Sequence, residues 1–388
     1  MNLHRNSVYF LVIAVIGLVV LGLIMLSSTA AFAPGKQGDQ LFFLKRQAAG
    51  LGVGVLVCAL VACIDYHVFQ RWWWLLAVFA FGLLLLCFVP EIGVRVKGAA
   101  RWIRVYPTSY QFQPSELAKL ATVAALAWWF ARHEEDALGF FRGFLIPLLM
   151  LGVMATPIAR EVDMGTTALL AMTTFVIMFV AGTRWRYLGP TIALAFGGLW
   201  FALTKMPERM GRVLAFMNPA KYPDDAYQQV QGLIALGSGG VEGLGLGNGR
   251  QKMAFLPEAH TDFILPVIGE ELGLRITLLI VFGYVVVVMC GAIIALRARD
   301  RFGMLFGFGI VLLIAFQAAI NIGVTTMVMP NKGFPLPFIS YGGTNLLFCL
   351  TGVGILINIY RQGFTEKEEK ARVVLPARVR NQRLPRRL

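Results

Sequence analysis

Apolar residues along this chain are gathered into long runs that are separated by polar stretches. Most runs are roughly 17–25 residues long, the length of a helix that crosses the hydrocarbon core of a bilayer. The pattern predicts ten such helices, over residues 8–28, 47–64, 73–90, 114–131, 143–158, 165–181, 187–204, 263–296, 303–325 and 344–361. The fold class predicted is therefore an all-α polytopic membrane protein with ten transmembrane helices and a large extracytoplasmic loop between helices 7 and 8.

Composition supports a membrane protein. Hydrophobic residues make up 57% of the 388 residues and charged residues 14%, whereas a soluble protein has about 25% charged residues. The first run follows Arg5 and ends before the sequence AFA at 31–33, which resembles a signal-peptide cleavage site. Its apolar core is too long for a signal peptide and nine more runs follow, so we expect an uncleaved helix.

The basic residues predict the orientation in the membrane. An even number of spans places both termini on one side, and the short loops on that side are repeatedly basic, at Arg184, Arg186, Arg297, Arg299 and Arg301. Basic short loops favour the cytoplasm. Residues 1–361 are predicted to form one membrane domain. Residues 362–388 form a basic, disordered cytoplasmic tail that is either attracted to anionic lipid or simply solvated.

The net charge of +14 does not indicate a nucleic-acid partner, because no soluble module interleaves aromatic with basic residues. Function is expected on the outer face instead, where the long loops 91–113, 205–262 and 326–343 lie. The stretch 226–240 has an apolar stripe suited to an interfacial helix. The glycine run 243–249 predicts tight turns rather than a nucleotide loop, since no βαβ unit surrounds it.

Basic residues surround a tryptophan in the first long loop. Arg95, Lys97, Arg101 and Arg104 flank Trp102. Such a group is typical either of an interfacial belt of basic and aromatic residues or of a cationic collar for a phosphate-bearing head group.

Two short acidic stretches precede predicted helices. In QPSELAK at 113–119, Pro114 suits a first helical position, and Glu116 and Lys119 have the spacing of an ion pair on one helix face. In REVDMGT at 160–166, Glu161 and Asp163 could cap a helix or contact a substrate, and the pattern does not distinguish the two.

The stretch MPNKGFPLPFISYGGT at 329–344 is apolar but too rich in proline and glycine for a helix. Irregular backbone at membrane depth is tolerated where it is buried in protein or lines a cavity. We expect Lys332 to point a cation into that cavity, since an ionisable residue at a membrane boundary indicates function.

The stretch LPEAHTDFI at 256–264 places Glu258, His260 and Asp262 before the eighth apolar run. One interpretation is that Asp262 is the N-cap of the following helix. Within that helix, Glu271 and Arg275 have the i,i+4 spacing of a local ion pair.

Taken together, RVKGAARWI, QPSELAK, LPEAHTDFI with IGEELG, and MPNKGFPLPFISYGGT resemble the SEDS family (shape, elongation, division and sporulation) over residues 8 to 361. The sequence NKG before the proline-rich motif resembles the division-type members more than the elongation-type members. One departure is EVDMGT, where many members have a PDLGT-like string and Val162 replaces the proline.

The resemblance implies a peptidoglycan glycosyltransferase that polymerises lipid II at the outer face of the bacterial cytoplasmic membrane, at the division septum. The essential acidic residue of the family falls on Asp262, the loop tryptophan on Trp102 and the motif lysine on Lys332. The substrate-binding residues expected are Lys332, Arg95, Lys97, Arg101, Trp102, Glu258, His260, Asp163, Gln231 and Ser340.

Two roles of Asp262 stay open. It could act as general base on an acceptor hydroxyl, or hold a divalent cation, Mg²⁺ or Mn²⁺, against the departing pyrophosphate. A lipid II flippase and a scaffold for a partner synthase are the rival functions.

The partners implied are lipid II, a class B penicillin-binding transpeptidase and other membrane proteins of the division complex. We expect the transpeptidase helix to pack on the eighth and ninth spans, where the small residues Gly283 and Gly291 could admit close approach.

Overall fold

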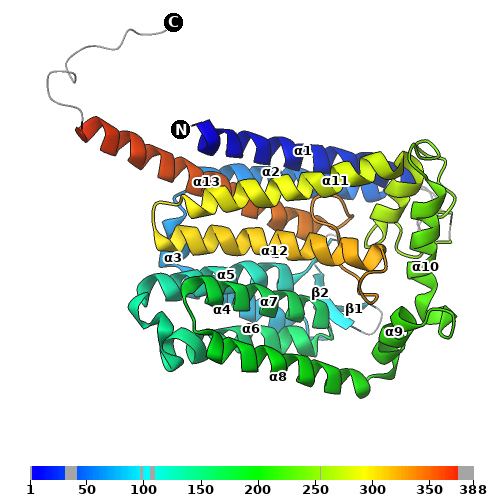
Figure 1. Ribbon diagram of the computed structural model, residues 1–388, viewed down its shortest axis with the longest axis horizontal. Coiled ribbons are helices and arrows are strands. Elements are labelled where there is room, and N and C mark those ends of the chain that lie inside the picture. The colour runs from blue at the N-terminus through cyan, green and yellow to red at the C-terminus, as the bar shows by residue number, and fades with distance from the viewer. Residues whose placement is uncertain (1, 31–41, 97–98, 105–109, 254, 375–388) are drawn as a thin grey trace, which may run out of the picture.

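The computed structural model describes residues 2–30, 42–96, 99–104, 110–253 and 255–374. Its longer helices run side by side as one bundle (Figure 1). The bundle helices are α1 (Asn2–Ala30), α2 (Phe42–Cys63), α4 (Trp73–Leu86), α5 (Pro114–Arg132), α6 (Ile146–Arg160), α7 (Met164–Ala181), α8 (Trp185–Thr204), α11 (Ile264–Leu296), α12 (Arg301–Thr325) and α13 (Gly343–Val374). The shorter elements are α3 (His67–Arg71), the 3₁₀ turn Glu135–Leu138, the π-helical turn Phe141–Leu145, α9 (Pro207–Met217) and α10 (Pro223–Ser238).

Every predicted apolar run coincides with a bundle helix. Among the described residues, seven helical segments are long and apolar enough to cross a membrane, so the chain is an all-α, multi-pass membrane protein. They correspond to α1, α2, α6 with its preceding π-helical turn, α7, α11, α12 and the first part of α13. Helix α4 is apolar but shorter.

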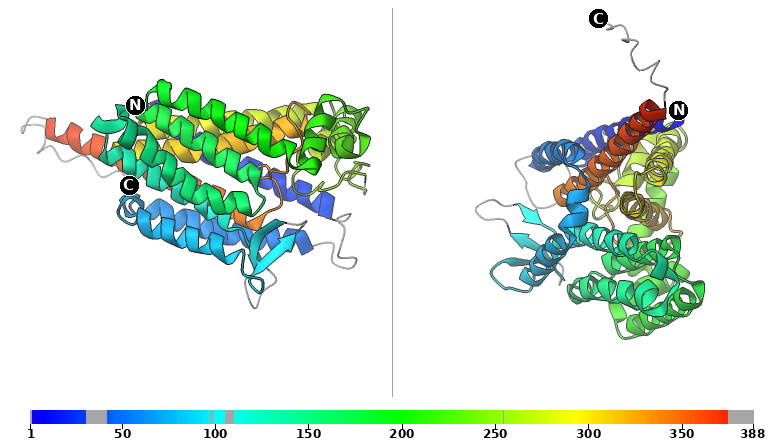
Figure 2. Two further views of the ribbon diagram at one scale, coloured as in Figure 1. Left: turned by 90° about the horizontal axis from the view of Figure 1, so that it is seen from below. Right: turned by 90° about the vertical axis from the view of Figure 1, so that its left-hand side faces the viewer.

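The loops predicted to be external gather at one end of the bundle. Figure 1 shows α9, α10 and the strands at this end, whereas α3 and the start of α1 lie at the opposite end. Helix α13 runs back to that opposite end, so the start of α1 and the end of α13 lie on the same side of the bundle (Figures 1 and 2). A helix is present in the stretch 226–240, as predicted, and it is α10.

The loop 91–113 contains a small antiparallel sheet that the hydrophobic pattern did not predict. Strand β2 (Ala99–Arg104) pairs with β1 (Gly93–Val96) on one side and β3 (Gln111–Phe112) on the other. The β1–β2 register shifts between Val94 and Arg95, as at a bulge. The strands carry Arg95, Arg101 and Arg104 beside the start of α5.

Helix α5 begins as predicted, with Pro114 in its first turn. The Lys119 ammonium lies 2.9 Å from the Glu116 carboxylate and donates to Gln317 Oε1 of α12 at 3.0 Å. All three side chains are buried. The predicted ion pair within α5 is thus confirmed, and the hydrogen bond from Lys119 to Gln317 joins α5 to α12 in the interior.

Helix α11 is broken at Gly273, whose φ of 78° and ψ of −179° are not helical. A Cβ at this position would lie 2.4 Å from the Val241 carbonyl oxygen, so only glycine fits the close approach of the two backbones. The Leu274 N–H donates to the Gly240 carbonyl at 3.0 Å. The tight turns predicted at 243–249 are confirmed by positive φ angles at Gly243, Gly245 and Gly247.

The predicted ion pair between Glu271 and Arg275 is wrong. Glu271 binds the Lys252 ammonium at 2.6 Å, and both side chains are almost fully buried. Arg275 binds the exposed Glu242 instead. The break at Gly273 separates Glu271 from Arg275, because the two residues no longer share one helical face.

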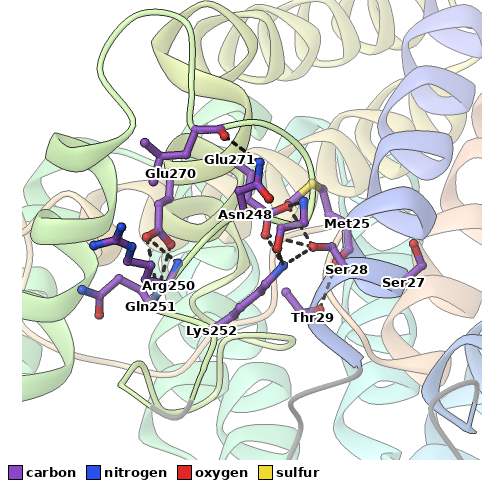
Figure 3. A network of polar contacts seen from close by, with 12 residues as sticks. Met25, Ser27, Ser28, Thr29, Asn248, Arg250, Gln251, Lys252, Glu270 and Glu271 are labelled. Atoms are coloured by element: carbon purple, nitrogen blue, oxygen red, sulfur yellow. Dashed lines mark hydrogen bonds and ion pairs between the residues drawn. The ribbon is translucent and has the colours of Figure 1, made fainter.

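Ser28, at the end of α1, completes the Glu271–Lys252 pair. Its hydroxyl lies 2.8 and 2.9 Å from the two Glu271 carboxylate oxygens and accepts from Lys252 at 2.7 Å (Figure 3). The Gly247 N–H donates to the same carboxylate at 2.9 Å. This buried network, which we call the Glu271–Lys252 staple, fastens the glycine-rich turns to α1 and α11.

Helix α13 continues to Val374, although its apolar, membrane-spanning part ends at Gly363. The first part of the tail, which was expected to be disordered, is therefore helical. The remaining part of that tail, 375–388, lies outside the described residues.

Candidate active site

Asp262 is not the N-cap of α11. The helix begins at Ile264, its N-cap is Phe263, and no side-chain capping hydrogen bond is made there. The Asp262 carboxylate lies instead against Gly333, where a Cβ would come within 2.4 Å of Oδ2. Its side chain is half-buried. The cap interpretation is therefore overturned, and the carboxylate faces a different segment of the chain.

That facing segment is residues 326–342, which we call the Pro-rich segment. It has no regular structure between α12 and α13, yet many of its residues are buried. Asn321 of α12 holds it beside Asp262, since its Nδ2 donates to the Asp262 carbonyl at 2.8 Å and to the Phe334 carbonyl at 2.6 Å. The prediction of irregular backbone buried in protein is confirmed.

Two glutamines add to this support. Gln317 Nε2, one turn before Asn321 on α12, donates to the Pro335 carbonyl at 2.9 Å. Gln229 Nε2, on α10, donates to the carbonyls of Val324 and Met329 at 2.9 Å each. Sequence reasoning missed Gln317, Asn321 and Gln229. The signal for the first two was present, because amide side chains four residues apart within an apolar span mark a polar contact.

The Ser340 hydroxyl forms hydrogen bonds with backbone groups. Ser340 is 2% exposed, and its hydroxyl donates to the Thr261 carbonyl at 2.6 Å and accepts from the Leu336 N–H at 2.7 Å. The Tyr341 N–H donates to the His260 carbonyl at 3.1 Å. The Pro-rich segment therefore follows residues 260–262 contact by contact, with Gly333 at Asp262, Ser340 at Thr261 and Tyr341 at His260.

Lys332 lies at the start of α7. The Lys332 Cε would be 2.3 Å from a Cβ at Gly165, so glycine makes room for the lysine. Asp163 caps α7, where its carboxylate accepts from the N–H and the hydroxyl of Thr166. The prediction left Asp163 undecided between a cap and a substrate contact, and the structure shows the cap.

Three arginines surround Lys332 and Asp163. Arg101 Nη1 is 3.9 Å from Asp163 Oδ1, and Arg101 Nη2 donates to the Val162 carbonyl at 2.8 Å. Arg209 Nη2, from α9, donates to the same carbonyl at 3.0 Å. The positive charge of Arg212, also on α9, disfavours the protonated form of Lys332 and so lowers its pKa. We call Arg101, Arg209, Arg212 and Lys332 the cation cluster.

Burial shifts two ionisable groups beside the cation cluster. Burial lowers the pKa of Lys332 to about 8, the Asp163 carboxylate opposes the shift, and the arginines reinforce it. Burial likewise raises the pKa of the Glu161 carboxyl to about 8. The interaction with the Cys87 thiol opposes this rise in the pKa of Glu161, but burial outweighs it, so the carboxyl is mostly neutral at pH 7. At pH 7 the site therefore holds a net positive charge.

The other predicted residues are spread more widely over this end. Arg95 is exposed on β1, Trp102 pairs with Val94 across the sheet, and Lys97 lies outside the described residues. Glu258 has a φ of 57° and accepts from the Thr261 hydroxyl at 2.9 Å.

Gln231 is half-buried on α10. Its neighbour Gly232 packs on the Phe263 ring. The glutamine of α10 that reaches the Pro-rich segment is Gln229, not Gln231. Arg209 and Arg212 were missed by sequence reasoning, although a pair of arginines three apart on one short external helix was a usable signal.

The side chains around Asp262 determine whether a divalent cation could be held there. Among the described residues, no three His, Cys, Asp or Glu side chains are grouped as metal ligands. A cation such as Mg²⁺, which prefers oxygen ligands and keeps several waters, would fit here only with Asp262 as protein ligand and phosphate oxygens of a substrate as the others.

Comparison with known proteins covers almost the entire chain. The family model described as "Cell cycle protein", which groups FtsW, RodA and SpoVE, matches residues 9–364. A probable peptidoglycan glycosyltransferase FtsW from Geobacter sp. (strain M18) is 39% identical over 351 residues, 90% of this chain and 95% of the relative. Stage V sporulation protein E from Bacillus subtilis is 37% identical over 353 residues, 90% of this chain and 96% of the relative.

Solved structures share the fold. A chain of a peptidoglycan synthase complex superposes with a TM-score of 0.75 at 28% identity, covering 92% of this chain and 98% of that one. RodA from Thermus thermophilus gives a TM-score of 0.66 at 27% identity over 91% of this chain and 96% of RodA. The family match, the relatives and the shared fold show that this chain belongs to the SEDS family of membrane proteins.

Proposed function

We propose that this protein is a peptidoglycan glycosyltransferase that polymerises lipid II. The observation that carries the proposal is the position of Asp262. Its carboxylate does not cap a helix and faces Gly333, the residue after Lys332 of the cation cluster. Glycosyl transfer from a pyrophosphate requires a base and a set of cations, and the fold brings both together from separate segments. The relatives named as glycosyltransferases support the same activity.

The chemistry follows from these groups. The 4-hydroxyl of an acceptor sugar attacks the anomeric carbon of the donor, and its proton passes to the Asp262 carboxylate. The bond between that carbon and the pyrophosphate oxygen breaks, and the electron pair leaves with undecaprenyl pyrophosphate. The cation cluster stabilises the charge that develops there. A bound divalent cation would supply further charge neutralisation to the pyrophosphate.

The substrate defines the orientation. Lipid II is anchored by its polyprenyl chain and presents its sugars outside the bacterial cytoplasmic membrane, so the end with α9, α10 and the Pro-rich segment faces outward. We therefore propose that all ten bundle helices, including α4, α5 and α8, cross the membrane and that both termini are cytoplasmic. The FtsW relatives support a role at the division septum, with an elongation role as the alternative.

One assay separates this function from its rivals. Purified protein in detergent, supplied with lipid II alone, should form glycan chains that are resolved by gel electrophoresis. A flippase has no transport to perform in detergent and would leave lipid II unchanged. A scaffold would do the same until a partner synthase is added. Absence of chains from well-folded protein would reject the proposal.

The pKa of Lys332 gives the activity an alkaline limit. Because its pKa is lowered to about 8, Lys332 is charged below that pH and loses its charge as the pH rises through it. We expect the KM for lipid II to increase between pH 7 and pH 9. Lys332→Arg keeps the charge across this range, so its KM should stay level. Equal pH profiles for the two proteins would contradict this assignment.

A class B penicillin-binding transpeptidase is the partner we propose, supported by the similarity to a chain of a peptidoglycan synthase complex. The glycines predicted for the contact are occupied within the chain, because a Cβ at Gly283 would meet Leu18 and one at Gly291 would meet Val311. The docking surface is better placed on the exposed side of α11. Four large apolar residues mark it, namely Leu278, Phe282, Val285 and Met289.

This docking surface is tested with bulky substitutions. Val285→Trp with Met289→Trp should reduce the amount of transpeptidase that co-purifies, because the added rings keep the partner helix at a distance. Val78→Trp, at an equally lipid-exposed position of α4, is the control and should leave co-purification unchanged. An unchanged yield with the α11 variant would discard this face.

A further inference from the structure

A group of aromatic side chains and one arginine lies beside the Pro-rich segment, at its Tyr341 end rather than its Lys332 end. It contains Phe42, Phe43, Arg46, Tyr110, His260 and Tyr341, and we call it the aromatic cluster. Its members come from α2, from the loop before β3, from the segment before α11 and from the Pro-rich segment. Residues this distant in sequence meet only because the fold brings them together.

The rings are arranged around one another. The Phe43 ring centroid is 4.9 Å from that of His260 and 5.1 Å from that of Tyr341. The Arg46 guanidinium lies over two rings, 4.8 Å from the Phe42 centroid and 4.9 Å from that of Tyr110. Tyr110 is 43% exposed, and the other members are half-buried. The cluster thus presents part of its aromatic surface to solvent, above all the Tyr110 ring.

The cluster is rigidly connected to Asp262. His260 is two residues before Asp262, and its carbonyl accepts from the Tyr341 N–H at 3.1 Å. The Pro-rich segment contacts Asp262 at Gly333 and reaches His260 at Tyr341. Asp262 therefore lies between Lys332 with the cation cluster on one side and the aromatic cluster on the other.

We propose that the aromatic cluster is the subsite for the acceptor sugar. This inference rests on the proposed glycosyl transfer, which needs a pyrophosphate-linked donor and a sugar with a free 4-hydroxyl at the same carboxylate. The cation cluster suits the pyrophosphate. Aromatic side chains pack on the C–H faces of pyranose rings. The Asp262 carboxylate would then take its proton from a hydroxyl held on this side.

An interfacial belt of aromatic residues is the plain alternative. Belt residues point outward to the lipid head groups, one by one. Here Phe43, His260 and Tyr341 point toward one another, and Arg46 lies over two further rings. The mutual packing favours a preformed binding surface.

Two probes test the subsite on the full chain purified in detergent. The first is an N-acetylglucosamine trimer, followed by saturation-transfer NMR, and the second is inorganic pyrophosphate. Phe43→Leu with Tyr110→Leu should weaken binding of the trimer on the order of ten-fold, since two ring contacts are lost, and leave pyrophosphate binding unchanged. Lys332→Met should weaken only pyrophosphate binding. Phe79→Leu, an exposed aromatic of α4, should change neither.

The single variant Tyr110→Leu controls for misfolding, because Tyr110 is the most exposed ring of the cluster and its replacement disturbs the packing least. It should show part of the loss of affinity for the trimer. The subsite is overturned if wild-type protein does not bind the trimer, or if the double variant binds it normally. If wild-type protein binds the trimer but makes no glycan from lipid II, the proposed function fails while the sugar-binding site stands.

Discussion

Asp262→Asn should abolish almost all polymerisation of lipid II while the protein folds and inserts normally. As general base, the carboxylate contributes roughly 10²–10⁴-fold in rate, which an amide cannot supply. Its side chain does not cap α11, and the hydrogen bond from Asn321 goes to the backbone carbonyl, which the substitution retains. The measurement is the initial rate of glycan formation at saturating lipid II, together with the unfolding temperature.

Asp224→Asn is the matched control. Asp224 is exposed in the first turn of α10 and lies outside the site, so its variant should retain the wild-type rate. Near-normal synthesis by Asp262→Asn would remove the general base from the mechanism. A lost rate accompanied by a lowered unfolding temperature would assign a structural role instead.

Lys252→Met should produce the largest loss of stability. The substitution leaves the Glu271 carboxylate buried without its counterion, and breaking a buried ion pair in this way costs roughly 3–5 kcal/mol. We expect the free energy of unfolding, measured by titration with a denaturing detergent, to fall by about this amount. The double variant Lys252→Met, Glu271→Leu should recover part of the loss, because no charge is then left buried.

Arg275→Met supplies the comparison on the same helix. Arg275 and Glu242 also form an ion pair, but both side chains are about 70% exposed, and exposed pairs contribute at most about 1 kcal/mol. A loss from Lys252→Met no greater than that from Arg275→Met would contradict the account of the staple.

The helices of the bundle could be predicted because each depends on its own composition. Long apolar runs give helices in any fold that keeps them in lipid, and Pro114 marks the start of α5 by local chemistry. The Glu116–Lys119 pair was predictable for the same reason, since i,i+3 spacing holds within one helix. The small sheet was not, because its strands are short and lack a period-two pattern.

Contacts between distant segments could not be read from local spacing. Arg275 follows Glu271 at the i,i+4 spacing of a helical ion pair, yet Gly273 breaks the helix between them. Glu271 pairs instead with Lys252, from the loop between α10 and α11. The N-cap interpretation of Asp262 was wrong for the same reason, because its carboxylate faces Gly333 of the distant Pro-rich segment. The cation cluster and the aromatic cluster each draw on several separate segments, so only the fold reveals them.

The break at Gly273 bears on hydrophobic matching. An unbroken helix of 33 residues would be about 50 Å long, against a hydrocarbon thickness of about 30 Å. The nine residues Ile264–Leu272 would then lift Asp262 about 14 Å further from the membrane. The break at the glycine lets the two parts of α11 take different directions, so the height of the carboxylate does not depend on the full length of the helix. A lipid-anchored substrate, whose reactive sugar cannot rise far above its polyprenyl chain, can therefore be met at the membrane surface.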